Sequence, residues 1–406
     1  MIQRWQEQNL VRALGVRRGV HLTGARQSGK TTLAETVNLD SCIRRSLDKS
    51  SLVNAAKSDP ELFVRRREGE TLIIDEIQKA PELLEEIKTK VDHDNSKGQY
   101  LLTGSSNLRF LKSVKDSLAG RFATVRLRTL TQGELNRSRP DFLEQVIHED
   151  FRRIDNRFDK QELIHAAFIG GYPEPLDFQE RDRQDWVRDY LNDLLTRDIK
   201  DVTEIRKLES LRNAVQWLFA HTSQLFSIEE FGSKTGLTRE TAQTYIAALS
   251  ALYLVDKIPA WGKSDYDKLG KRPKYIVTDL SLAANSLGWV EEEVVFDENI
   301  NGKLAESWAY HEISAQMDFS GGYEVSHYRD SDKREIDFIL EHGGKEVIGM
   351  EVKCGSSVGI SDFKTMKWFK SKFKIDRFIG IVLYTGSDVL GFGNHMYAVP
   401  FANMVF

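Results

Sequence analysis

Gly24-Ala-Arg-Gln-Ser-Gly29-Lys30-Thr31 is the stretch that decides the fold of this chain. A short apolar run over residues 19–23 precedes it, and a helical pattern begins near Gly29. A glycine-rich turn between a strand and a helix lets backbone N–H groups wrap phosphates, and the helix N-terminus adds positive potential. Lys30 would neutralise the β- and γ-phosphates, and the hydroxyl of Thr31 would hold Mg²⁺. The pattern predicts a site for ATP and Mg²⁺ formed by Gly24, Ala25, Arg26, Gln27, Ser28, Gly29, Lys30, Thr31 and Thr32.

Two carboxylates end the later apolar run Leu72-Ile-Ile-Asp75-Glu76. A buried strand that ends in two carboxylates costs solvation free energy unless they meet a cation or water. The carboxyl edge of a parallel sheet is where α/β proteins place their ligands. We therefore predict that Asp75 orders Mg²⁺ and that Glu76 polarises the water that attacks the γ-phosphate.

Two further residues are candidates for contacts with a nucleotide. Ser105 follows the next apolar run and could touch the γ-phosphate or the attacking water; an ordinary loop cap is the alternative. Arg121 precedes the fifth run and could reach the phosphate of a neighbouring subunit as an arginine finger, in which case the protein is a homo-oligomer. A salt bridge within the fold is the other interpretation of Arg121.

Changes of pattern along the chain indicate its domains. Short apolar runs flanked by helical stretches favour an α/β fold with a parallel sheet covered on both faces. A charged helical stretch follows, and strands and helices alternate again from about residue 295. We predict an ATPase core, a helical lid or connector, a winged-helix-like domain and an α/β tail, over residues 1–135, 136–222, 223–290 and 291–406 respectively.

Composition excludes several classes of protein. The 406 residues, 40% of them hydrophobic and 29% charged, suffice for two or three globular domains. Two cysteines, Cys42 and Cys354, argue against a disulfide framework or a zinc cluster. The start is polar, and no apolar stretch approaches the length of about 20 residues that spans a bilayer. We expect a cytoplasmic protein without membrane contact.

The middle of the chain predicts a second kind of module. Two short helices joined by a turn at Gly236, followed by an apolar strand over residues 254–258, indicate a winged helix. In a DNA-bound form Arg239, Gln243 and Thr244 would face a groove. A helix pair that docks a protein is the alternative.

Charged side chains in the tail share one face of the predicted strands. Asp337 alternates with apolar neighbours, and Glu351 and Lys353 emerge together from the next strand. Two carboxylates and an ammonium on one face predict an Mg²⁺ or Mn²⁺ site, whose ligand set Glu306 on the preceding helix could complete. The metal would activate water, while Lys353 orients it or offsets charge. A surface salt bridge is the plain alternative for any single pair.

These motifs carry a family resemblance over nearly the whole chain. GARQSGKT, LIIDE, LLTGSS and LAGR occur in the order found in AAA+-type ATPases that carry a DUF4143 region. The later segments that resemble this family are Gly170-Gly-Tyr-Pro-Glu174, Arg197-Asp-Ile199, Lys303-Leu-Ala-Glu306, Glu335-Ile-Asp337 and Glu351-Val-Lys353. The resemblance implies an additional-strand ATPase core, a helical lid, a winged helix and a nuclease-like tail. The tail resembles PD-(D/E)XK nucleases, although Glu-Ile rather than Pro precedes Asp337.

Our leading hypothesis is an Mg²⁺-dependent ATPase that acts on DNA, which the tail cleaves or binds. Lysines 364, 367, 370, 372 and 374 could contact phosphates or form a solvated helix face. The rival is a nucleotide-dependent switch that docks a protein partner and has an inert tail. ATP binding without turnover is a third possibility.

Overall fold

A parallel sheet organises the N-terminal part of the chain. The structure, a computed structural model, describes residues 2–37, 41–105, 118, 120–203, 208–268, 270–344 and 346–406. The sheet has the strand order β2-β3-β4-β1-β5 with every pair parallel. Its strands are β1 (Gly19–Thr23), β2 (Cys42–Ser46), β3 (Thr71–Asp75), β4 (Tyr100–Gly104) and β5 (Phe122–Arg126). The predicted α/β class with a parallel sheet is confirmed.

Helices cover both faces of this sheet, and every residue of its three central strands is buried. One apolar cluster joins the sheet to α5 and another joins it to α1 and α2. The helices are α1 (Gln6–Val16), α2 (Lys30–Thr36), α3 (Ser50–Ser58), α4 (Pro60–Phe63), the short η1 (Ile77–Lys79) and α5 (Leu83–His93). Order β2-β3-β4-β1-β5 brings the carboxyl ends of β1, β3 and β4 side by side, which is where the phosphate loop emerges.

The middle of the chain is mainly helical. One apolar cluster joins α9, α10, α11, α12 and α14 to the hairpin β6–β7, and Ala25 of the phosphate loop packs into it. The predicted helix pair and strand are present, but their assignment to a winged-helix fold stays a prediction. The elements are α6 (Gln132–Leu135), α7 (Phe142–His148), α8 (Lys160–Ile169), η3 (Glu174–Asp177), α9 (Glu180–Thr196), η4 (Asp198–Asp201), α10 (Leu208–Ala220), α11 (Ile228–Thr235), α12 (Arg239–Ala251), β6 (Val255–Ile258), α13 (Asp265–Lys268), β7 (Lys274–Val277), α14 (Leu280–Ser286) and α15 (Glu291–Val294).

A mixed sheet with the order β12-β13-β11-β10-β9-β8 forms the tail. The long helix α16 packs against one face through one apolar cluster, and α17 packs against the other through a second. The elements are α16 (Glu298–Ser320), β8 (Tyr323–Arg329), β9 (Glu335–His342), β10 (Glu346–Lys353), η5 (Ile360–Phe363), α17 (Lys364–Phe373), β11 (Arg377–Tyr384), β12 (Leu390–Gly391), β13 (Met396–Pro400) and α18 (Ala402–Val405). A nuclease-like fold for this domain stays a prediction.

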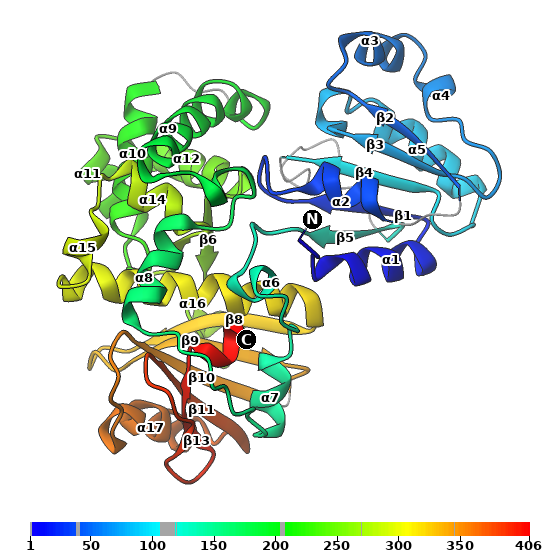
Figure 1. The fold of residues 1–406 in the computed structure, drawn as a ribbon. Coiled ribbons are helices and arrows are strands. Elements are labelled where there is room, and N and C mark those ends of the chain that lie inside the picture. Colours follow the sequence, from blue (N-terminus) through cyan, green and yellow to red (C-terminus); the bar gives the residue numbers. More distant parts are fainter. Residues whose placement is uncertain are drawn as a thin grey trace.

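Figure 1 shows the core in blue to cyan beside the green helices, with the tail below them. An ion network joins all three parts. Asp256 on β6 accepts from Arg126 at 2.9 Å and from Arg128 at 2.9 Å, and Arg128 also donates to Asp318 on α16 at 2.7 Å. Burial alone raises the pKa of Asp256, but the two guanidiniums lower it well below its ordinary value. The residues that leave β5 are thereby fixed to both neighbouring units.

Among the residues that the structure describes, no helix is both long and apolar enough to cross a bilayer.

Candidate functional site

The phosphate loop follows β1 and is held by segments outside it. A Cβ on Gly24 would lie 2.0 Å from the carbonyl oxygen of Leu127, so only glycine fits this close approach. From the N-terminal segment, Arg4 donates to the carbonyl oxygen of Ser28 at 2.8 Å and to that of Arg128 at 2.6 Å. These contacts hold the loop at the start of α2, where a helix N-terminus favours a phosphate.

Lys30 lies at the first position of α2 and is buried. Its Nζ donates to the carbonyl oxygen of Ala25 at 2.7 Å, within the loop itself. Burial lowers the pKa of Lys30 to about 8, although the carboxylates of Glu76 and Asp75 oppose this. The ammonium thus stays mostly protonated at neutral pH and lies close to both carboxylates.

The structure brings Thr31 and Asp75 together at the carboxyl edge of the sheet. The Thr31 hydroxyl donates to Asp75 Oδ2 at 3.0 Å, and the hydroxyl of Thr103 donates to the other side of the same carboxylate. A hydroxyl and a carboxylate oxygen in contact are the donor set that Mg²⁺ takes in proteins, so these residues fit that metal.

Glu76 has a left-handed backbone with φ of 58°. Its N–H donates to Thr103 Oγ1 at 3.3 Å, and its carboxylate accepts from the amide of Gln78 and, at 3.3 Å, from the hydroxyl of Ser105. A left-handed backbone costs free energy for a residue with a Cβ and is concentrated at functional sites. Ser105 therefore contacts the Glu76 carboxylate in this structure, and its contact with a nucleotide stays a prediction.

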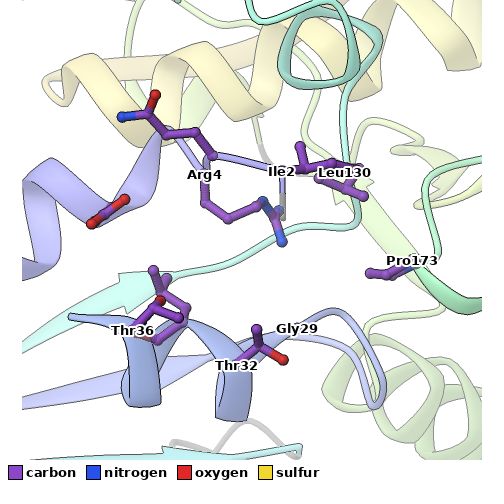
Figure 2. Close-up of a pocket in the computed structure, with 10 residues that line it drawn as sticks. Ile2, Arg4, Gly29, Thr32, Thr36, Leu130 and Pro173 are labelled. Atoms are coloured by element: carbon purple, nitrogen blue, oxygen red, sulfur yellow. Dashed lines mark hydrogen bonds between the residues drawn. The ribbon is translucent and has the colours of Figure 1, made fainter.

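A cavity of about 440 Å³ lies beside the loop. Figure 2 shows Gly29 and Thr32 on one side and Ile2, Arg4 and Leu130 on the other. Pro173 closes the third side, and the lining is mainly apolar. Such an apolar cavity next to a phosphate site suits a flat, heteroaromatic base.

The segment Gly170-Gly-Tyr-Pro-Glu174 reaches this cavity because it is joined to the core. The N–H of Leu130 donates to the carbonyl oxygen of Gly171 at 2.7 Å. A Cβ on Gly171 would lie 2.0 Å from the carbonyl oxygen of Leu130, which explains the glycine. Asp279 accepts from the N–H of Gly171 at 2.9 Å, so the helical unit holds the segment from the other side.

Arg121 lies far from the loop of its own chain. It immediately precedes β5, whose first residue Phe122 pairs with the first residue of β1, whereas the loop follows the last residue of β1. The guanidinium forms an ion pair with Asp92, with Nη2 at 2.9 Å from Oδ2. The structure therefore shows the salt bridge that was one interpretation of Arg121, and a reach toward a neighbouring subunit stays a prediction.

A lysine that sequence reasoning missed lies among the carboxylates of the tail. Lys274, from β7 of the middle unit, is fully buried. Its Nζ lies 2.5 Å from Glu306, 3.5 Å from Glu335 and 3.6 Å from Asp337. Burial lowers the pKa of Lys274, but these carboxylates outweigh that effect and raise it above its ordinary value. An ammonium thus holds three of the acidic groups together.

Of the other residues predicted for the tail site, Glu351 and Asp337 lie close together, whereas Lys353 lies apart from them. Burial raises the pKa of Glu351, and the neighbouring charge of Asp337 raises it further. Asp337 itself accepts from the N–H of Val352 at 2.9 Å. Lys353 does not join the carboxylates, because its Nζ donates to Asp362 at 2.6 Å.

An ammonium, rather than space for a metal, therefore lies at the centre of these tail carboxylates. Across the described ranges, no group of three or more His, Cys, Asp or Glu side chains is arranged to hold a metal ion. The predicted tail metal set of Glu306, Asp337 and Glu351 does not fit a metal in this arrangement, since Lys274 already provides the positive charge.

The fold and the loop define a core that carries a P-loop, the phosphate-binding loop of nucleotide-binding proteins. Residues 16–136 match the AAA domain family. Residues 160–293 and 301–404 match two domains of unknown function, DUF8612 and DUF4143. The first and third of these matches agree with the resemblance drawn from the motifs.

Two curated relatives are similar over nearly the whole chain. The uncharacterized proteins Mb2031c of Mycobacterium bovis and Rv2008c of Mycobacterium tuberculosis are each 26% identical over 402 residues. The alignment covers 96% of this chain and 82% of each relative.

Two solved structures are distantly similar to this chain. The Thermotoga maritima RuvB Holliday junction branch migration motor is 16% identical with a TM-score of 0.29, over 70% of this chain and 94% of that chain. The S. cerevisiae Hsp104–ADP complex is 14% identical with a TM-score of 0.28, over 77% of this chain and 45% of that chain. At these TM-scores neither carries an argument about this protein.

Proposed function

We propose that this protein is an Mg²⁺-dependent ATPase. The observation that carries the proposal is the convergence of Lys30 and Thr31 with Asp75 and Glu76 at one edge of the sheet. Lys30 would leave the carbonyl oxygen of Ala25 and bind the β- and γ-phosphates. Mg²⁺, when held by Thr31 and Asp75, supplies charge that stabilises the transferring phosphoryl group.

Glu76 would orient the attacking water and accept its proton. Gln78 and Ser105 hold the carboxylate of Glu76 in place, which favours one orientation of that group. The base would lie in the cavity next to Gly29 and Thr32, between Ile2 and Leu130. A bound nucleotide would therefore contact the N-terminal segment, the core and the segment that contains Pro173.

Phosphate release from ATP by the native protein and by Lys30→Ala tests this proposal. We expect Mg²⁺-dependent hydrolysis in the native protein and a loss of at least about 10²-fold in the variant, because the loop loses its phosphate-binding cation. Lys57→Ala on the exposed side of α3 is the matched lysine control and should keep full activity. Native protein that binds ATP without hydrolysing it would leave the nucleotide as a structural ligand and refute the ATPase.

We further propose that the ATPase acts on DNA and that its tail binds the polymer. The support is α17, whose lysines 364, 367, 370 and 372 lie on its half-buried or exposed positions while Met366 and Phe369 face the core. Trp368 has Lys372 at 5.1 Å and Arg334 at 4.3 Å from its ring centroid. Cations interleaved with an aromatic ring suit a phosphate backbone with exposed bases. Arg239 of the helix pair forms an ion pair with Glu229 at 3.2 Å, which makes α17 the better candidate surface.

Fluorescence anisotropy with labelled single- and double-stranded DNA tests this second proposal. Lys364→Glu/Lys372→Glu should weaken binding by about tenfold or more at low salt and reduce the salt dependence of the affinity. The double variant Lys49→Glu/Lys57→Glu, at exposed lysines of the core, makes the same charge change. It should bind DNA more tightly than Lys364→Glu/Lys372→Glu does. Equal losses would show a non-specific charge effect. No DNA binding by the native protein would favour the rival switch that docks a protein partner.

Incubation of the same DNA with Mg²⁺ or Mn²⁺ tests whether the tail has metal-dependent nuclease activity. With Lys274 among the carboxylates, we expect binding without cleavage in the presence of Mg²⁺ or Mn²⁺. Cleavage that disappears in Asp337→Ala would instead establish the tail as a nuclease.

A further inference from the structure

Arg26, in the phosphate loop, is held by the helical unit through both its side chain and its backbone. Arg26 Nη1 donates to the two carboxylate oxygens of Asp198, at 2.7 and 3.0 Å. Asp198 is the first residue of η4, just beyond the end of α9. From α9 itself, the hydroxyl of Tyr190 donates to the carbonyl oxygen of Arg26 at 3.1 Å. In Figure 1 the loop before α2 faces the green helices.

The Arg26–Asp198 pair belongs to the electrostatic environment of the phosphate site. Buried Lys30 interacts with the charges of Glu76, Asp75, Arg26 and Asp198. Arg26 in turn interacts with Asp198, Asp193 and Glu76. Its side chain is 37% exposed, whereas Lys30 is 4% exposed as a residue, so Arg26 is the cation with room to move. The carboxylates around Lys30 and Arg26 outnumber these two cations. Asp198 is therefore one of several acidic groups that compete for the guanidinium of Arg26.

A terminal phosphate would be a strong competitor for Arg26. Its oxygens accept two parallel N–H bonds from a guanidinium as a carboxylate does, and it carries more negative charge. The γ-phosphate is the end of ATP that faces Glu76 in the proposed function, and Glu76 is one of the charges that Arg26 interacts with. The α- and β-phosphates, which ADP also has, lie nearer the amides of the loop and Lys30.

We propose that Arg26 binds the γ-phosphate and that Asp198 holds this guanidinium when no ATP is bound. ATP and Asp198 then compete for one side chain, so ATP, but not ADP, releases η4 from the loop. This proposal rests on the proposed ATPase function and makes Asp198 a positioning residue. Tyr190 and Ala25 keep the loop in contact with the helical unit meanwhile, so only the ion pair is exchanged. The helical unit thereby senses which nucleotide is present.

Binding of fluorescent ATP and ADP analogues to native protein, Arg26→Ala, Asp198→Asn and the double variant tests this competition. Arg26→Ala should weaken the affinity for ATP by about tenfold and the affinity for ADP by less than about twofold, because only ATP presents the γ-phosphate. Asp198→Asn keeps the shape of the side chain and should strengthen ATP binding by about threefold to tenfold. In the double variant, Asp198→Asn should not change the affinity for ATP any further, since the Arg26 side chain for which ATP and Asp198 compete is absent.

Two results would overturn the proposal. One is an equal loss of ATP and ADP affinity in Arg26→Ala; the other is an effect of Asp198→Asn that persists without Arg26. Arg26→Lys keeps the charge but not the two parallel donors. Its affinity for ATP, but not its affinity for ADP, should lie between those of the native protein and Arg26→Ala. If Asp198→Asn does not fold, the ratio of ATP to ADP affinity in Arg26→Ala and Arg26→Lys still decides. Failure of the proposed ATPase looks different, because it is measured as the absence of phosphate release from ATP by the native protein, whereas the competition is measured as the ratio of ATP to ADP affinity.

Discussion

Glu76→Gln is expected to bind ATP as the native protein does and to hydrolyse it about 10²- to 10⁴-fold more slowly, the usual contribution of a positioned general base. Glutamine keeps the size of the side chain and its contacts with Gln78 and Ser105, but it cannot accept the proton of the attacking water. Lys30, Thr31 and the base cavity are unchanged, so substrate affinity should shift by less than about threefold.

Single-turnover phosphate release and equilibrium binding of an ATP analogue measure the two quantities separately. Glu85→Gln on the exposed side of α5 is the matched control and should leave both unchanged. A Glu76→Gln variant that loses affinity and turnover together would show that Glu76 holds the metal or the loop instead. A variant that turns over at the native rate would place the base elsewhere.

Lys274→Met is expected to destabilise the protein by about 3–5 kcal/mol, because it leaves buried carboxylates without their cation. Lys274 contacts Glu306, Glu335 and Asp337. Its side chain is fully buried, so water does not reach the position of the ammonium to replace its charge. Burial already raises the pKa of Glu306. The loss should therefore grow as pH rises and the unpaired carboxylates ionise, since a raised pKa in the folded state makes stability fall with pH.

Urea unfolding across pH measures this effect. Lys257→Met on the neighbouring strand β6 removes an exposed lysine and should cost less than about 0.5 kcal/mol. Lys274→Met/Glu306→Gln should recover part of the loss, because it removes one of the unpaired charges. A loss no larger than that of Lys257→Met would show that the carboxylates are neutral without Lys274. Stabilisation of Lys274→Met by Mn²⁺, absent in the native protein, would reveal a cation site that Lys274 fills.

The sequence predicted the strands and the helix that flank the phosphate loop well, because the signals for these elements are local. A glycine-rich turn between an apolar run and a helix can form only a few structures, and the later apolar run that leads to Asp75 lies in β3. Asp75 and Glu76 follow from their place at a strand end, since parallel strands present their carboxyl ends to one edge. The presence of both strands and helices in the tail was also predictable from the pattern of the sequence.

Contacts between distant segments could not be predicted in this way. Arg4 supports the loop, Asp198 holds Arg26 and Lys274 neutralises the tail, yet each is an ordinary charged residue in its own segment. Lys353 shows the converse, because its strand and phase were predicted correctly while its partner, Asp362, came from a different element.

The sequence by itself determined which segments form the phosphate loop, the acidic strand end and the predicted tail strands, because backbone periodicity and glycine conformation act over a few residues. Only the tertiary structure decided which cation meets which carboxylate. Ion pairing depends on the distance between side chains and on the burial they share, and both arise from the packing of elements far apart in the chain. The partners of Arg26 and of Glu306 are therefore properties of the assembled domains.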